Sequence, residues 1–169
     1  MAGDAPNIRS VRAMDGRRLV IAWRGGAESV VDIAEHIDKF AIFAPLRDDD
    51  SLFRDVTVGE WGWCLHWSDE IEISSDMLWR LALEQGSGWL HEWRETHGIT
   101  QSEAAKALGV SPRMWRYYEA GSHLLPKTVR LALAAPCSVR RWLVSAENKI
   151  ALHTLASGTG SGPRGLSTT

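Results

Sequence analysis

The side chains best suited to chemistry in this 169-residue sequence lie between residues 111 and 117. Two arginines, Arg113 and Arg116, accompany the phenol of Tyr117 and the thioether of Met114. A guanidinium group can bond a phosphate or, through two parallel hydrogen bonds, the O6 and N7 atoms of guanine. A phenol can donate a hydrogen bond to phosphate, whereas a thioether offers apolar contact. Presented together on one helix, these side chains could bind a nucleic acid.

Two other groups of side chains are candidates for a metal or catalytic site. His91 and His97 are six residues apart, so they do not share a helix face as a four-residue spacing would allow. Cys64 and His66 share one face of a predicted strand, which leaves a catalytic thiol pair open, but no acidic third member is evident. We therefore expect no metal, no cofactor and no enzymatic activity.

The arginines need a helix whose other face is anchored in the protein. At 100° per residue, Trp115 and Tyr118 lie on one side of a predicted helix over 112–120. Arg113 and Arg116 lie on the opposite side. We therefore expect the two aromatic side chains to be buried and the two arginines to be exposed.

A second short helix is predicted over 101–108, directly before the first. Thr100 and Glu103 have the spacing of a capping box at its start. Gly109 favours the left-handed conformation that ends a helix, and Ser111 can cap the next one. Two short helices joined by a tight turn satisfy the geometric requirement of a helix-turn-helix.

This stretch resembles the lambda-repressor-like (Cro/CI, or XRE) helix-turn-helix family, whose second helix enters the major groove of DNA. The shared pattern is Thr-Gln, a pair of alanines, Leu-Gly-Val-Ser and Tyr-Glu-x-Gly, matched by Thr100, Gln101, Ala104, Ala105, Leu108, Gly109, Val110, Ser111, Tyr118, Glu119 and Gly121.

The resemblance implies double-stranded DNA as the partner. It implies that Gln101 binds a backbone phosphate and that Ser111 lies at the groove edge. The complete set of expected DNA-binding residues is Gln101, Ser111, Pro112, Arg113, Met114, Arg116 and Tyr117.

The sequence departs from this family at four positions. Ala104 stands where the family usually has Leu, and Trp115 where it has Ile or Val, so a large residue can fill the space beside a small one. Pro112 and Met114 stand where polar residues are usual, which removes two hydrogen-bonding groups from the expected contact surface.

The N-terminal half has the pattern of a mixed fold. The run RDDDS at 47–51 predicts a charged, solvated loop rather than a cation site. Apolar periodicity predicts strands at 8–14, 19–23, 28–33, 56–58, 61–67 and 71–73, and helices at 34–40 and 76–84.

This half resembles a small bacterial domain of unknown function that also occurs fused in front of lambda-repressor-like domains. The resemblance implies a small α+β fold and no activity. Four tryptophans are expected to be core because of their alternation, with a ligand or partner surface as the alternative: Trp23, Trp61, Trp63 and Trp67. The matching features are Asp15-Gly16, VVDI at 30–33, Phe43 to Leu46, the strand ending in Trp67, and Ser-Ser-Asp-Met-Leu at 74–78.

Charge also divides the chain. Residues 1–85 hold 9 Lys and Arg against 16 Asp and Glu, a net charge of −7, whereas residues 86–169 hold 10 against 5, a net charge of +5. Gln85-Gly86-Ser87-Gly88 is typical of a linker between them. A basic half is suited to a polyanion.

The predicted organisation is an α+β domain at 1–85, with a small antiparallel sheet and helices, followed by an all-α helix-turn-helix domain of about five helices at 86–153. A Gly/Ser/Thr-rich tail at 154–169 is expected to be disordered. The expected helices of the second domain are 89–97, 101–108, 112–120, 127–135 and 139–152.

No apolar run approaches the roughly 18 residues that span a bilayer, so no membrane segment is expected. The start lacks the pattern of a signal peptide, and two cysteines are too few for a disulfide framework. These features favour a bacterial cytoplasmic protein.

Three hypotheses follow. The first is a DNA-binding regulator, dimeric on a palindromic operator, in which Lys127, Arg130, Arg140 and Arg141 either reach phosphates or are solvated. The second is an antitoxin-like or other interaction module whose N-terminal domain binds a protein partner. The third, an enzyme using Cys64 and His66, is the least supported.

Overall fold

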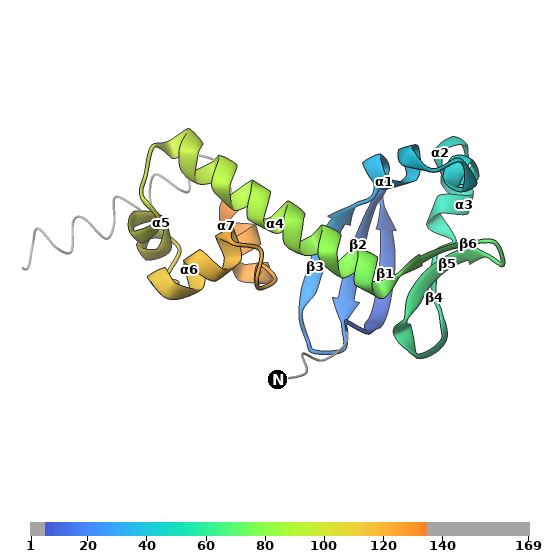
Figure 1. Ribbon diagram of the computed structural model, residues 1–169, viewed down its shortest axis with the longest axis horizontal. Helices are drawn as coiled ribbons and strands as arrows, with labels where there is room; N and C mark the ends of the chain where they lie inside the picture. The colour runs from blue at the N-terminus through green and yellow to red at the C-terminus, as the bar shows by residue number, and fades with distance from the viewer. Residues whose placement is uncertain (1–5, 135–169) are drawn as a thin grey trace, which may run out of the picture. The chain divides into compact units, whose positions relative to one another are not determined.

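The computed structural model describes residues 6–134. Two small antiparallel sheets with helices come first, and only helices follow (Figure 1). This arrangement confirms the predicted α+β domain followed by an all-α domain, although the predicted single sheet is divided into two. The predicted helix at 139–152 and the tail at 154–169 lie outside the described residues. No helix within 6–134 has the length and apolarity to cross a membrane.

The first sheet contains three strands in the order β1-β2-β3, each antiparallel to the next. Its first turn is the predicted Asp15-Gly16, where Gly16 has a φ of 72°. The strands are β1 (Ile8–Met14), β2 (Arg18–Trp23) and β3 (Glu28–Asp32).

Short helices occupy the segment where a charged loop was predicted. The loop prediction for 47–51 is wrong because Asp49 caps a helix: its carboxylate accepts from the backbone amides of Ser51 at 2.8 Å and Leu52 at 3.1 Å. An aspartate at this position satisfies amides that the first helical turn leaves unpaired. The elements are α1 (Ala34–Lys39), the 3-10 helix η1 (Ala41–Phe43), α2 (Ala44–Asp48) and α3 (Asp50–Arg54).

The second sheet has the order β4-β5-β6 and begins later than predicted. The strand expected at 61–67 starts only at Cys64, because Trp61 and Gly62 adopt positive φ angles of 57° and 79°. A Cβ at Gly62 would lie 2.2 Å from the carbonyl oxygen of Ile8. Its elements are β4 (Thr57–Val58), the 3-10 helix η2 (Glu60–Gly62), β5 (Cys64–Ser68) and β6 (Ile71–Ser74).

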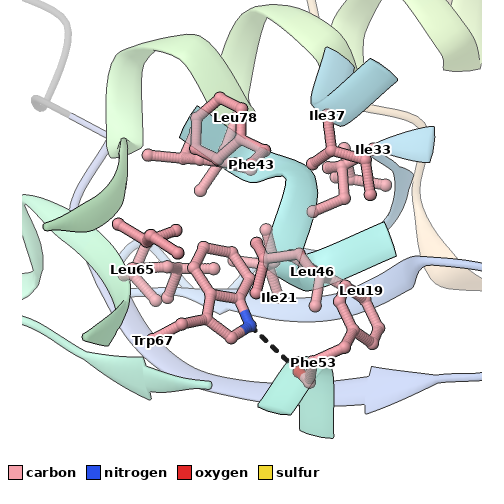
Figure 2. Packing of buried hydrophobic residues seen from close by; sticks show 14 of the residues in the cluster. Leu19, Ile21, Ile33, Ile37, Phe43, Leu46, Phe53, Leu65, Trp67 and Leu78 are labelled. Atoms are coloured by element: carbon pink, nitrogen blue, oxygen red, sulfur yellow. Dashed lines mark hydrogen bonds between the residues drawn. The ribbon is translucent and has the colours of Figure 1, made fainter. Parts of the chain in front are cut away.

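One hydrophobic core joins both sheets to the short helices (Figure 2). Within it, the Trp67 indole donates to the carbonyl of Phe53 at 2.9 Å. The prediction that the tryptophans are core is right for Trp23 and Trp67, which are buried. It is wrong for Trp61 and Trp63, which are 71% and 51% exposed, because they precede the strand.

A single helix, α4 (Ser75–His97), replaces two predicted helices and the predicted linker. Figure 1 shows it without interruption. Leu78 on its first half belongs to the core of the sheets, whereas Leu90 belongs to a second core among the helices that follow. The residues 85–88 are therefore part of a helix that both cores share.

Three shorter helices complete the described chain, in agreement with the predicted positions. They pack around a core that includes Leu90 and Trp115. Their bounds are α5 (Gln101–Ala107), α6 (Pro112–Glu119) and α7 (Lys127–Ala134).

The backbone at Gly62 yields a stability prediction. We expect Gly62→Ala to lower the free energy of unfolding by at least about 2 kcal/mol, through strain at positive φ and the close Ile8 carbonyl. Urea denaturation followed by tryptophan fluorescence measures it. At Gly25 an added Cβ meets nothing within 4 Å, so Gly25→Ala is the matched control and should cost less than about 1 kcal/mol. Equal losses in the two variants would contradict this account.

Candidate nucleic-acid interface

The turn between α5 and α6 is built by local capping. Thr100 accepts from the Glu103 amide at 3.3 Å, and the Glu103 carboxylate accepts from the Thr100 amide at 2.7 Å, which confirms the capping box. Gly109 has the expected left-handed φ of 67°. Ser111 caps α6 by accepting from the Met114 amide at 3.2 Å. These contacts fix where α6 starts.

Packing fixes which face of α6 looks outward. Trp115 is fully buried and Tyr118 is nearly so, as predicted. Both belong to one core with the fully buried Ala104 and Ala105, whose small side chains let α5 approach closely. Ser111, Pro112, Arg113 and Arg116 are exposed, and Met114 and Tyr117 are half-buried.

The exposed Arg113 contacts the half-buried Tyr117 on α6, and Tyr117 also contacts a residue that was not predicted. The Nε of Arg113 donates to the Tyr117 hydroxyl at 3.1 Å, and its Cζ lies 5.5 Å from the centre of the Tyr117 ring. The His123 imidazole stacks on the same ring at 5.0 Å. His123 follows the end of α6, so helical periodicity could not include it.

Gln101 is bound within the protein. Its amide nitrogen donates to a carboxylate oxygen of Glu119 at the end of α6. The other carboxylate oxygen accepts from the Nε of Arg94, on α4, at 2.7 Å. The family-derived role of Gln101 at a phosphate therefore stays a prediction, whereas its contact with Glu119 joins three helices.

The Glu119 side chain is only 7% exposed, and its environment decides its charge. Burial raises the pKa of this carboxyl, but hydrogen bonds from Arg94 and Gln101 and the positive charge of Arg94 outweigh burial. The net result is a pKa below the ordinary value of 4.5. The carboxylate is charged at neutral pH and holds α6 against α4 and α5.

Two basic residues on α7 have a partner that neither sequence-based alternative included. Arg130 donates to the Glu28 carboxylate and to the Glu28 carbonyl oxygen, each at 3.1 Å. The ammonium of Lys127 lies 3.1 Å from the same carboxylate. The pKa of Glu28 lies below its ordinary value, and the hydrogen bond from Lys127 is the largest cause. Arg140 and Arg141 lie outside the described residues.

The pair considered for catalysis has an acidic neighbour. Glu72 lies opposite His66 on the neighbouring strand of the sheet. Burial, followed by the charge of Glu72, raises the pKa of the Cys64 thiol. Because the thiolate is the nucleophilic form, this environment opposes nucleophilic catalysis. Among residues 6–134, no three His, Cys, Asp or Glu side chains are grouped so that they could hold a metal.

The Glu119 contacts predict a pH-dependent stability. We expect Glu119→Gln to lower the free energy of unfolding at neutral pH by about 1–3 kcal/mol, since charged hydrogen bonds are lost. A lowered pKa means that this contribution is present above 4.5 and disappears as the pH falls through the pKa of the folded protein. The difference in the free energy of unfolding between wild type and variant, measured by urea denaturation, should therefore become smaller below pH 4.5.

Glu92→Gln is the matched control, because Glu92 is exposed on α4 and its side chain has no hydrogen-bond or ion-pair partner within residues 6–134. It should change stability by less than about 0.5 kcal/mol at either pH. A gap for Glu119→Gln that stayed constant across the titration would show that the charge is not what holds the helices.

Comparisons with known proteins agree with this two-part organisation. Residues 8–84 match the family described as "Protein of unknown function (DUF2442)", and residues 88–144 match the family described as "Helix-turn-helix domain". No curated protein matches significantly. A crystal structure from Nitrosomonas europaea, described as a "Putative DNA Binding Protein", is 28% identical. The match covers 77% of this chain and 85% of that one, with a TM-score of 0.45. The chain thus contains a DUF2442 domain followed by a helix-turn-helix domain.

Proposed function

We propose that this protein binds double-stranded DNA with α6 in the major groove and regulates transcription in the cytoplasm as a lambda-repressor-like protein. The observation that carries the proposal is the complete burial of Trp115, which directs Arg113 and Arg116 outward. Helix-turn-helix domains place their second helix in the major groove, and α6 is that helix.

The proposed contact surface contains the seven residues expected from the sequence. Arg113 and Arg116 supply charge, and Tyr117 can contact phosphate or a thymine methyl group. The Ser111 hydroxyl accepts the hydrogen bond from the Met114 amide that caps α6. Its own proton is left to donate to a phosphate. Gln101, Pro112 and Met114 complete the set, and Pro112 and Met114 supply apolar contact.

We propose that two copies bind a palindromic operator, with one α6 in each half-site about one helical turn apart. The domain limits expected from the sequence, 1–85 and 86–153 with a tail at 154–169, are kept in this proposal. Because α4 crosses residue 85 as a helix, the N-terminal domain would then dimerise or bind a partner while attached directly to the DNA-binding domain.

The DNA-binding proposal is tested with single arginine variants. We expect Arg113→Ala and Arg116→Ala each to weaken binding to a selected operator at least about fivefold. A variant that loses a phosphate contact should also lower the log-log salt slope by about 0.9. Fluorescence anisotropy at several salt concentrations measures both quantities.

Arg24→Ala is the control because Arg24 is exposed in the N-terminal domain and lies outside the proposed contact surface. Unchanged affinity in both α6 variants would remove α6 from the interface. Equal weakening by Arg24→Ala would show that affinity depends on net charge alone.

Binding of a protein partner by the N-terminal domain is the second candidate function, and Trp61 favours it. Its indole is 71% exposed although its backbone has a positive φ of 57°, which is costly for a bulky residue. The Asn7 side chain holds this conformation by donating to the Trp61 carbonyl at 3.0 Å. Strain that keeps large aromatic surface in solvent is typical of interaction sites.

This candidate predicts a loss of affinity without a loss of fold. The partner is first recovered with the full chain and purified. We expect Trp61→Ala to weaken the binding of this partner by at least about tenfold. Ile42→Ala removes another exposed apolar side chain of the same domain, and we expect it to leave the affinity unchanged. Calorimetry measures both. Recovery of the partner by the Trp61→Ala chain at wild-type affinity would exclude this surface.

A further inference from the structure

Three side chains contact one another in a row, Arg113 and Tyr117 on the outer side of α6 and His123 beyond its end, and we call them the arginine row. The guanidinium of Arg113 touches Tyr117 twice: its Nε donates to the hydroxyl at 3.1 Å, and its Cζ lies 5.5 Å from the ring centre. The His123 ring lies 5.0 Å from that ring, with only 23° between the two planes. An exposed arginine is thus held in one direction.

The contacts of Arg113 decide which of its donors are free. The Nε hydrogen is used by Tyr117, whereas neither Nη atom has a hydrogen-bond partner in the described part of the chain. The two Nη groups of a guanidinium form a fork that matches two neighbouring acceptors. In the major groove only guanine presents two such acceptors, O6 and N7, on one base.

Arg116 provides the internal comparison. It is exposed on the same helix, but within residues 6–134 its side chain makes no hydrogen bond, ion pair or aromatic contact. When it binds one fixed pair of atoms, a free arginine loses more rotamer freedom than an arginine that is already held in place. It is therefore better suited to a phosphate, which accepts hydrogen bonds from many directions.

We propose that Tyr117 and His123 are positioning residues that hold the fork of Arg113 toward the O6 and N7 atoms of one guanine in each half-site. This inference rests on the proposed DNA-binding function and adds a base preference to it. In the preference for guanine, Arg113 is the residue that touches the base, and Tyr117 and His123 act through Arg113. Arg116 then contributes affinity that does not depend on the base.

The test uses the full chain and a DNA site selected from a random library. Each guanine of that site is replaced in turn by 7-deazaguanine, which lacks the N7 acceptor. The measured quantity is the ratio of Kd values with and without the replacement. We expect a ratio of about tenfold for one guanine per half-site, because one charged hydrogen bond is lost.

The variants separate positioning from contact. Arg113→Ala should bring the ratio of Kd values to about one, since the side chain that bonds N7 is gone. Tyr117→Phe keeps the ring but removes the hydroxyl, and His123→Ala removes the stacked imidazole; each should reduce the ratio to about threefold or less. His123→Phe should restore it by stacking. Arg116→Ala should weaken binding to every DNA equally and leave the ratio of Kd values unchanged.

The outcomes distinguish the two levels of the proposal. A wild-type chain that enriches no DNA would overturn the proposed function and this inference with it. If the wild-type chain binds DNA but the Tyr117→Phe and His123→Ala variants keep its full ratio of Kd values, only the arginine row would be overturned. Uniform weakening in Tyr117→Phe would instead place the phenol on a phosphate.

Discussion

The burial of Trp115 is the constraint on which the described helical region depends. The indole is completely enclosed, and the neighbouring Ala104 and Ala105 make room for it. Its Nε1 has no hydrogen-bond partner among the described residues, a loss of about 1–3 kcal/mol. Burying a surface as large as that of tryptophan yields more, about 4–6 kcal/mol. Rotating α6 to expose the indole would lose that difference, so the arginines of α6 remain outside.

The helix α4 shows why local sequence patterns fail at residues 85–88. Two glycines in a helix cost about 1 kcal/mol each relative to alanine, so the Gly-Ser-Gly pattern favours a linker. The helix is continuous because Leu78 and Leu90 bury its two halves in the two cores, and this tertiary packing outweighs the cost of the glycines. The Ser87 hydroxyl donates to the Glu119 carbonyl at 2.6 Å, and a Cβ on Gly86 would lie 3.6 Å from Leu125. That distance is an ordinary van der Waals contact, and a Cβ on Gly88 would meet nothing within 4 Å, so packing requires neither glycine.

The parts of the candidate site that local sequence could predict are those that local interactions decide. Caps act within three residues, and the outward direction of Arg113 follows from helical periodicity around Trp115. The contacts of Glu119 with Arg94 and Gln101 join residues 25 and 18 positions apart, and no short pattern indicates them. The same holds for Trp61, whose exposure depends on a positive φ that the alternating sequence does not predict.

The counted charge of a segment overstates the charge that a polyanion meets. Lys127 and Arg130 belong to the basic half of the sequence, but both pair with Glu28, so a phosphate would first have to displace a carboxylate. Arg113 and Arg116 have no acidic side chain within ion-pair distance in the described chain. Positive potential at α6 therefore comes from arginines that Trp115 turns outward, whereas the two cations of α7 share one carboxylate, that of Glu28. The distribution of free charge, rather than the sum of +5, is what favours α6 as the surface that meets DNA.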